Sequence, residues 1–225
     1  METMLDSALA SIAMANGSPV DFGEYCAVIG PLFGKTLSEI GMEYLSSRKF
    51  TRLHQVLLRV DKSLTLDEYL SSASRDEINY NIERTDSRYR TPLTWAVEFG
   101  LADAACMLLA HGANPCLPKF SERGHSTLLH LAVAGPASQF GIGGYHAVVR
   151  ALLEAGVDIN SRDHEGWTPL HIAASWGLCD LDDFLTHFAL DWNVLTDNGQ
   201  SVDDLSPDGR FSTTILARFR PGLAN

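Results

Sequence analysis

The sequence has few cations and no long apolar run, and both deficits limit what the protein can be. Lysine and arginine number 17 against 28 aspartate and glutamate residues, which gives a net charge of −11. Because phosphate affinity depends on clustered Lys and Arg, nucleic acid is not expected as a partner. No apolar stretch of about 18 residues occurs, and Glu2 and Asp6 stand where a secretion signal would be basic. We therefore expect an intracellular protein, cytoplasmic or nuclear, with no membrane as a partner.

Cysteine is scarce, and the spacing typical of metal sites, Cys-x-x-Cys, is missing. The four cysteines are Cys26, Cys106, Cys116 and Cys179. We interpret them as reduced and structural, and we expect Cys106 on the buried side of a helix. The motifs His-Glu-x-x-His, Gly-x-Ser-x-Gly and Gly-x-Gly-x-x-Gly are absent as well. The sequence therefore predicts a protein that is not an enzyme and that uses no metal and no cofactor.

One segment partly resembles a phosphate-binding loop. It runs from Gly30 to Thr36 and reads Gly-Pro-Leu-Phe-Gly-Lys-Thr. A true loop of this kind has one more residue between its glycines, so that successive N–H groups surround the phosphates, and Pro31 has no N–H to offer. We interpret the segment as a turn followed by a helix start. A stand-alone nucleotide-binding enzyme is the less favoured alternative.

What the chain does contain is a recurring phrase. Its copies are Thr91-Pro92-Leu93-Thr94-Trp95-Ala96, Thr127-Leu128-Leu129-His130-Leu131-Ala132, Thr168-Pro169-Leu170-His171-Ile172-Ala173 and, more weakly, Ser201-Val202-Asp203-Asp204-Leu205. A Thr before Pro caps a helix, and Pro suits the first helical position. Gly100 and Gly177 follow at the distance where such a helix would end in a left-handed residue. In three of the copies a second helix is predicted after the first, around Leu108-Leu109, Leu152-Leu153 and Phe184-Leu185.

The spacing of the copies identifies the kind of repeat. Gly166 and Gly199 are 33 residues apart, the length of an ankyrin repeat. The copy that begins at Thr127 is longer, and the excess is an insertion at Pro136–Gly143. The chain resembles the ankyrin-repeat family over about residues 50–220, most strongly from Asp86 to Asn193.

The resemblance implies an all-α ankyrin-repeat solenoid of helix-turn-helix repeats joined by β-turn or hairpin loops. The expected repeats cover residues 50–85, 86–121, 122–162, 163–195 and 196–220. In the first, Thr51 begins a degenerate copy and Thr65 with Glu68 has capping-box spacing for a second helix. In the last, Pro207-Asp208-Gly209 ends the first helix early. Residues 1–49 are expected to form a helical N-terminal cap; the alternative is the tail end of a larger upstream domain.

Two further features follow from the resemblance. His54, His130 and His171 occupy equivalent points of their repeats, and in the family this imidazole hydrogen-bonds the backbone of a neighbouring loop. We therefore interpret these histidines as structural. Tyr89 stands where the family has a turn glycine, a substitution that resists the turn because Tyr has a side chain.

The function implied is non-catalytic protein–protein interaction, with a protein partner on the concave face and a monomeric chain. Family contacts fall on the turn before each repeated phrase and at the end of each first helix. The expected partner-binding residues are Arg88, Arg90, Glu98, Phe99, His164, Glu165, Trp167, Ser175 and Trp176. The three aromatics should act as anchors, since buried aromatic and Arg side chains dominate interface energy. The competing interpretation, for Phe99 and Trp176 above all, is packing against a neighbouring repeat.

Other interpretations stay open at this point. The chain could be a regulatory or targeting segment of a larger multidomain enzyme. The insertion could bind a partner through Phe140 and Ile142, although an insertion without function fits as well. Eight Asp and no Lys or Arg lie between Asp180 and Asp208; we favour a solvated face over a site for a basic partner, and calcium is disfavoured because the Asp-x-Asp-x-Asp-Gly order is missing.

Overall fold

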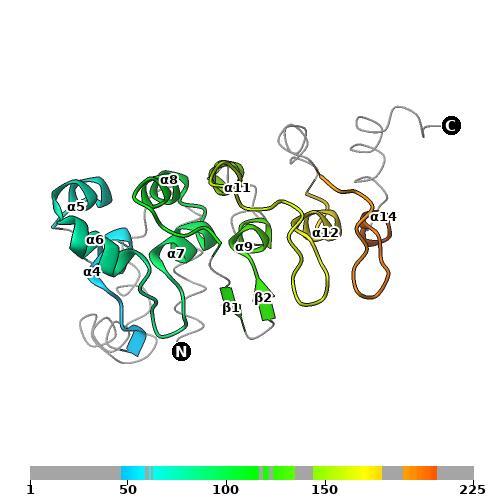
Figure 1. Cartoon of the computed structure of the whole chain (residues 1–225), viewed down its shortest axis with the longest axis horizontal. Helices are drawn as coiled ribbons and strands as arrows, with labels where there is room; N and C mark the ends of the chain where they lie inside the picture. Colours follow the sequence, from blue (N-terminus) through cyan, green and yellow to red (C-terminus); the bar gives the residue numbers. More distant parts are fainter. Residues whose placement is uncertain are drawn as a thin grey trace, which may run out of the picture. The chain divides into compact units, whose positions relative to one another are not determined.

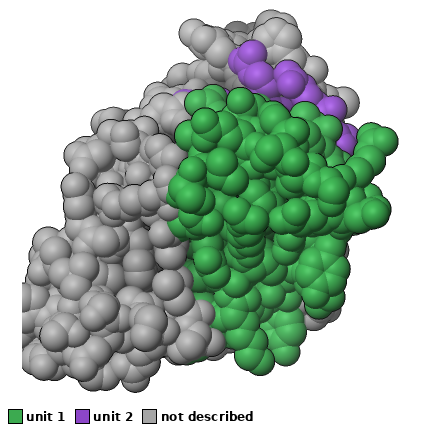
Figure 2. All heavy atoms as spheres, turned by 90° about the vertical axis from the view of Figure 1, so that its left-hand side faces the viewer, with its two compact units in different colours: residues 1–114 green, residues 115–225 purple. Residues whose placement is uncertain are grey.

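The computed structural model describes residues 47–58, 61, 63–116, 119–121, 124–134, 144–178 and 190–206. The chain divides into two compact units, residues 1–114 and residues 115–225, which have separate colours in Figure 2. Several predictions lie wholly or mostly outside the described residues. They are the cap at 1–49, of which only 47–49 are described, the loop at 30–36, the insertion at 136–143, the helix around Phe184-Leu185 and the chain beyond Ser206. Among the described residues, no helix is long and apolar enough to cross a membrane.

Unit 1 consists of short helices in its described part (Figure 1). They are α4 (Arg52–Leu57), α5 (Leu66–Ser72), α6 (Arg75–Ile82), α7 (Pro92–Glu98) and α8 (Ala102–Ala110). Helix α4 packs against α5, α6 and α7, and α7 packs along α8. The core between them includes Leu53, Trp95 and Leu108, all without exposed surface.

The first repeat begins as the sequence predicts and then adds an unpredicted helix. The Thr51 side chain caps α4, and Thr65 with Glu68 forms the expected capping box at the start of α5. Helix α6 was not predicted. Ser74 caps it by accepting a hydrogen bond from the Glu77 N–H at 3.2 Å, so a local signal for its start is present in the sequence.

Unit 2 repeats the helical pattern. Its described elements are β1 (Lys119–Ser121), β2 (Gly124–Ser126), α9 (Leu128–Ala134), α11 (Gly144–Glu154), α12 (Pro169–Ser175) and α14 (Val202–Leu205). The strands form an antiparallel hairpin with Lys119 opposite Ser126, which fits the hairpin loops expected between repeats. Helix α12 packs against both α9 and α14, and α9 also packs against α11. The helix predicted around Phe184-Leu185 lies outside the described residues.

The predicted helix starts and ends are confirmed in both units. The hydroxyl oxygens of Thr91 and Thr168 accept hydrogen bonds from the N–H groups three residues later, at 3.1 and 3.4 Å. Gly100 and Gly177 follow α7 and α12 with φ angles of 67° and 65°. Such left-handed angles favour glycine because it has no Cβ. Helix α14 ends at Leu205, before Pro207, also as predicted.

One expectation about burial is wrong. Cys106, expected on the buried side of its helix, is exposed. The buried residues of α8 are Ala105 and Leu108, and each helical residue is rotated by about 100° from the one before it. The core-facing side of α8 is therefore one residue out of phase with the prediction, and Cys106 presents its thiol to solvent.

Candidate functional site

A turn of constant geometry precedes α7, α12 and α14, each of which is the first helix of its repeat. In each, the first residue donates its backbone N–H to the carbonyl four residues later. The bonds join Asp86 to Arg90 at 2.9 Å, Asp163 to Trp167 at 2.8 Å and Thr196 to Gln200 at 3.0 Å. A side-chain oxygen closes the same loop from inside, because Asp86 Oδ1, Asp163 Oδ1 and Thr196 Oγ1 accept the N–H of that fourth residue at 2.8–3.1 Å.

Each turn also requires a left-handed backbone two residues before the capping hydroxyl. Gly166 and Gly199 occupy this position in unit 2, with φ angles of 76° and 75°. Tyr89 occupies it in unit 1 with φ 60°, and Lys49, two residues before Thr51, has φ 55°. The replacement of the turn glycine noted in the sequence therefore leaves the turn geometry unchanged. The left-handed angle is strained at Tyr89 and Lys49, because these residues have a Cβ.

Two of the recurring histidines, His54 and His130, each join their own repeat to the next one. His54 Nε2 lies 3.1 Å from the Arg90 carbonyl oxygen, and His130 Nε2 lies 3.0 Å from that of Trp167. The Nδ1 atom of each lies 2.8–2.9 Å from the capping Thr hydroxyl of its own repeat. A carbonyl can only accept, so Nε2 bears the proton and Nδ1 accepts. The structural role predicted for these two histidines is confirmed.

Burial keeps these imidazoles neutral. It lowers the pKa of His54 to about 4, against a smaller opposing effect of the Asp86 carboxylate. The pKa values of His130 and His171 are also lowered by burial. Near His171, the carbonyls of Val194 and Gln200 oppose part of this decrease. The neutral form is the one that these bonds need, because Nδ1 must accept a hydrogen bond.

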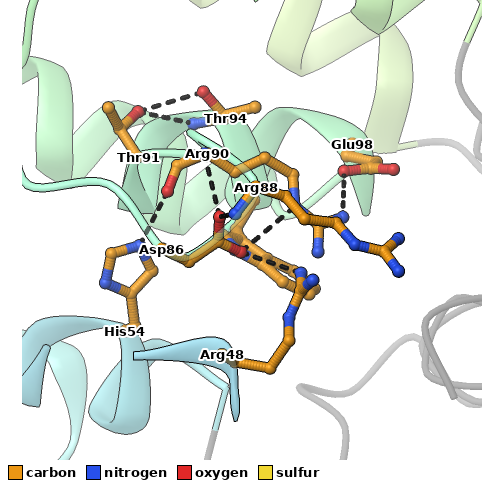
Figure 3. A network of polar contacts seen from close by, with 9 residues as sticks. Arg48, His54, Asp86, Arg88, Arg90, Thr91, Thr94 and Glu98 are labelled. Carbon is orange, nitrogen blue, oxygen red and sulfur yellow. Dashed lines mark hydrogen bonds and ion pairs between the residues drawn. The ribbon is translucent and has the colours of Figure 1, made fainter. Parts of the chain in front are cut away.

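Asp86 is the centre of a buried polar network in unit 1 (Figure 3). Its Oδ1 accepts the backbone N–H groups of Arg88 and Arg90, at 2.8 and 3.0 Å. Its Oδ2 accepts from Arg48 Nη2 at 2.8 Å, Trp95 Nε1 at 3.1 Å and Arg90 Nε at 3.3 Å. Five donors thus converge on one carboxylate whose side chain has no exposed surface. Hydrogen bonds from charged donors such as the Arg48 and Arg90 guanidinium groups are stronger than those between neutral groups.

Aromatic rings enclose this network. The Arg90 guanidinium carbon lies 3.7 Å from the centroid of the Trp95 ring, at cation–π distance. Phe99 stacks on Trp95 at 5.0 Å between centroids, and Phe50 meets the same ring edge-on at 5.5 Å. Arg90 also bonds Glu98 at 3.0 Å. The network therefore ties the turn, α7 and the segment before α4 together.

The structure places the expected unit 1 residues at different depths. Arg88 and Glu98 are half-buried, and Arg90 is buried in the Asp86 network. Phe99, expected as an exposed anchor, is only 7% exposed because it packs on Trp95. The ring that covers Phe99 thus belongs to its own repeat, whereas the competing interpretation named a neighbouring repeat. Arg90 and Phe99 are thus parts of the core more than of the surface.

The expected unit 2 residues lie nearer the solvent. His164 and Glu165 are exposed at the tip of their turn, with His164 Nε2 3.6 Å from Glu165 Oε1. Trp167 and Ser175 are half-buried. Trp176, directly after α12, is 41% exposed, so packing against a neighbouring repeat does not bury it. Of the three expected aromatic anchors, Trp176 is the most exposed.

Models of known families match two parts of the chain. An ankyrin-repeat model matches residues 88–119, and a model of multiple ankyrin repeats matches residues 137–186. The chain is an ankyrin-repeat protein. Among the described residues of this ankyrin-repeat protein, no group of three or more His, Cys, Asp or Glu side chains could hold a metal ion. Ankyrin repeats mediate protein–protein interaction, so the functional site to look for is a binding surface.

Relatives of this ankyrin-repeat protein include regulatory subunits of a phosphatase. Protein phosphatase 1 regulatory subunit 12A of Mus musculus is 35% identical over 82 residues, 36% of this chain. Protein phosphatase 1 regulatory subunit 27 of Homo sapiens is 43% identical over 61 residues, 27% of this chain. The matches span only 7% and 40% of those relatives' own lengths.

Sequence reasoning missed two structural features of this ankyrin-repeat protein. One is the Arg48–Asp86 pair, which joins positions 38 residues apart and leaves no local pattern. The other is Lys49 in the turn-glycine position. A signal for Lys49 was available, since it precedes Thr51 by the same two residues that separate Tyr89 from Thr91.

Proposed function

We propose that this ankyrin-repeat chain is a non-catalytic module that binds protein phosphatase 1 and regulates it. The regulatory subunits 12A and 27 support the choice of partner, because the regions they share with this chain exceed 30% identity. The observation that carries the proposal of a binding surface is the exposure of Trp176 at a helix end that the family uses for contact.

The surface proposed comprises Trp176, Trp167, Ser175, His164 and Glu165, and we call it the tryptophan surface. Its residues belong to one turn and the end of the helix that follows it, α12. In ankyrin solenoids such positions line the concave face. A Trp ring there offers a large apolar area with few rotatable bonds, which suits an interface anchor.

The backbone under this surface is held before any partner arrives. The Trp176 N–H donates to the Ile172 carbonyl at 3.2 Å, and Gly177 fixes the chain direction after it. Trp167 is held on both sides, since its N–H donates to Asp163 Oδ1 at 2.8 Å and its carbonyl accepts from His130. A surface that is already ordered loses little entropy on binding, which favours affinity.

The test is isothermal titration calorimetry of the chain with the catalytic subunit of protein phosphatase 1. We expect binding, and we expect Trp176→Ala to weaken it by about 2 kcal/mol, roughly 30-fold. Tyr80→Ala is the matched control, because Tyr80 is an aromatic with 61% exposure on α6, outside the tryptophan surface. Absence of binding would refute the phosphatase as partner; equal binding by wild type and Trp176→Ala would refute the tryptophan surface.

Regulation needs a separate readout. Dephosphorylation of a protein substrate by the phosphatase should change in rate when the chain is added, and Trp176→Ala should need a correspondingly higher concentration for the same change. The chain alone should release no phosphate. An unchanged rate at saturating chain would mean that the chain binds without regulating.

A further inference from the structure

Two side chains in unit 1 occupy a backbone conformation that glycine adopts in unit 2. Lys49 and Tyr89 have φ angles of 55° and 60°, where Gly166 and Gly199 have 76° and 75°. For residues with a Cβ this conformation is disfavoured by contact with the following carbonyl. The turn hydrogen bond is nevertheless the same, from Tyr89 N to Asp86 O at 3.1 Å and from Gly166 N to Asp163 O at 3.2 Å.

Burial does not compensate for this strain. Tyr89 is 65% exposed, the highest value among the exposed large hydrophobic side chains of the described residues. Lys49 is exposed as well. A large exposed side chain in a strained conformation is a candidate for ligand contact, because strained residues cluster at ligand-binding positions.

The two strained residues lie on adjoining turns. The Ser87 N–H donates to the Arg48 carbonyl at 2.8 Å, so the backbones of the two turns are hydrogen-bonded one residue before Lys49 and two before Tyr89. The ion pair between Arg48 and Asp86 also connects these two turns (Figure 3). Arg88, half-buried, lies between Ser87 and Tyr89. Lys49, Arg88 and Tyr89 together form what we call the turn-tip cluster.

The turn-tip cluster is cationic in an acidic protein. Its two charged members, Lys49 and Arg88, are both cations, whereas the whole chain has a net charge of −11. The neighbouring guanidinium groups of Arg48 and Arg90 are buried and paired with Asp86 and Glu98, so they are not counted in the cluster. The equivalent turns of unit 2 have the opposite character, with Asp163 and Glu165 in one and Asp197 in the other. Positive charge at the turn tips is therefore a property of unit 1.

We propose that the turn-tip cluster binds an acidic segment of the protein partner. Lys49, Arg88 and Tyr89 each present N–H or O–H donors, and carboxylates are the side chains that accept from all three. The Tyr89 ring adds apolar contact area beside the charges. This inference rests on the proposed protein-binding function and adds the chemistry of one part of the partner.

The test uses fluorescence anisotropy with a short labelled peptide of alternating glutamate and serine, and a lysine–serine peptide of the same length for comparison. The net charge of the chain favours the basic peptide, so preferential binding of the acidic peptide would come from a local site. We expect that preference, with affinity decreasing as salt is added. Equal binding of both peptides, or preference for the basic peptide, would overturn the proposal.

The decisive variant is Lys49→Gly/Tyr89→Gly, which relieves the backbone strain and so should fold at least as stably as wild type. We expect its melting temperature to rise and its affinity for the acidic peptide to fall by about tenfold. The control Arg75→Ala removes an exposed cation from α6 in the same unit. Equal losses in the control and in the double glycine variant would overturn the proposal, because charge alone would then explain binding.

The same variants separate this inference from the proposed function. If the phosphatase does not bind but the acidic peptide binds in a manner that needs Lys49 and Tyr89, the choice of partner fails and the turn-tip cluster stands. If the phosphatase binds wild type and the peptide shows no preference, the turn-tip cluster fails and the proposed function stands. Arg88→Glu tests whether the three residues act as one site. If they do, it should weaken peptide binding by no more in the Lys49→Gly/Tyr89→Gly variant than in wild type.

Discussion

Arg48 and Asp86 form an ion pair of 2.8 Å although neither side chain has any exposed surface. Arg90 and Trp95 donate to the same carboxylate oxygen. A pair that is removed from water is stabilising only when its remaining hydrogen-bonding groups are satisfied, and removal of one partner leaves an uncompensated charge. The turn before α7 therefore depends on Asp86 more strongly than its counterparts in unit 2 depend on theirs.

Replacement of Asp86 should destabilise unit 1 severely. In Asp86→Asn the two buried guanidinium groups lose their carboxylate, and we expect the free energy of unfolding to fall by about 3–5 kcal/mol. Urea unfolding followed by circular dichroism measures this. The control Asp163→Asn, where the carboxylate accepts the backbone N–H groups of Glu165 and Trp167, should lose only about 1–2 kcal/mol. Equal losses of unfolding free energy in the two variants would mean that the ion pair between Arg48 and Asp86 contributes little to stability.

Stability should fall as pH decreases from about 6.5 to about 4. The pKa of His54 is lowered from 6.5 to about 4 in the fold, so over this range the unfolded chain binds a proton that the folded chain does not. The stability present above pH 6.5 is thereby lost on acidification, by about 3 kcal/mol for His54. His130 and His171 act in the same direction. Unfolding free energies across this range provide the measurement.

His54→Gln isolates the contribution of one imidazole to this pH dependence. The variant cannot titrate in the window, so its stability should change less steeply between pH 6.5 and 4 than that of wild type, whatever its absolute stability. Hydrogen bonds donated by Ser63 and Ser201 lower the pKa values of the Asp61 and Asp204 carboxyls, but these groups are the same in variant and wild type, so their contribution cancels in the comparison. Identical slopes in variant and wild type would exclude His54 as the source.

The two turn glycines of unit 2 should respond differently to alanine. A Cβ at Gly199 would meet no atom within 4 Å, so Gly199→Ala should cost only the left-handed strain, about 1 kcal/mol. A Cβ at Gly166 would collide with the Arg162 guanidinium and with Asp197, whose backbone N lies at 2.8 Å. Gly166→Ala should therefore cost clearly more. Melting temperatures of the two variants test the difference, and equal decreases would contradict it.

Phe99 and Trp176 should separate stability from binding. Phe99→Ala removes a ring that is stacked in the core and should cost about 3–5 kcal/mol. Trp176→Ala removes a side chain that is 41% exposed and should cost clearly less, about 1 kcal/mol. The loss of affinity for the partner, measured on folded protein, should be larger for Trp176→Ala than for Phe99→Ala. A large loss of stability in Trp176→Ala would show that its ring supports the fold.

Local signals in the sequence were enough for the helix boundaries. Thr91, Thr168, Gly100 and Gly177 act through hydrogen bonds and backbone angles within a few residues, so their spacing alone locates α7 and α12. The structural role of His54 could also be predicted, because an imidazole that recurs at the same point of three repeats serves the repeat. Helix α6 had a comparable signal in Ser74 that was overlooked.

The depth of the site residues could not be predicted in the same way. Phe99 is buried because the Trp95 ring, itself enclosed by Phe50 and Arg48, offers a surface on which it stacks. Each of these contacts depends on tertiary packing between α7 and the segment before α4. Cys106 shows the same limit, since one residue of helical phase reversed its exposure. A repeat pattern predicts which positions are equivalent but not which side chains the neighbours cover.

The bond from His54 to Arg90 ends on a main-chain oxygen, and so does the bond from His130 to Trp167. The side chains at the accepting positions are unrelated in chemistry, a cation in one turn and an indole in the other. In both cases adjacent repeats are thus joined through a backbone carbonyl, which every amino acid has. The bond between the repeats therefore places no requirement of its own on the side chain at that position.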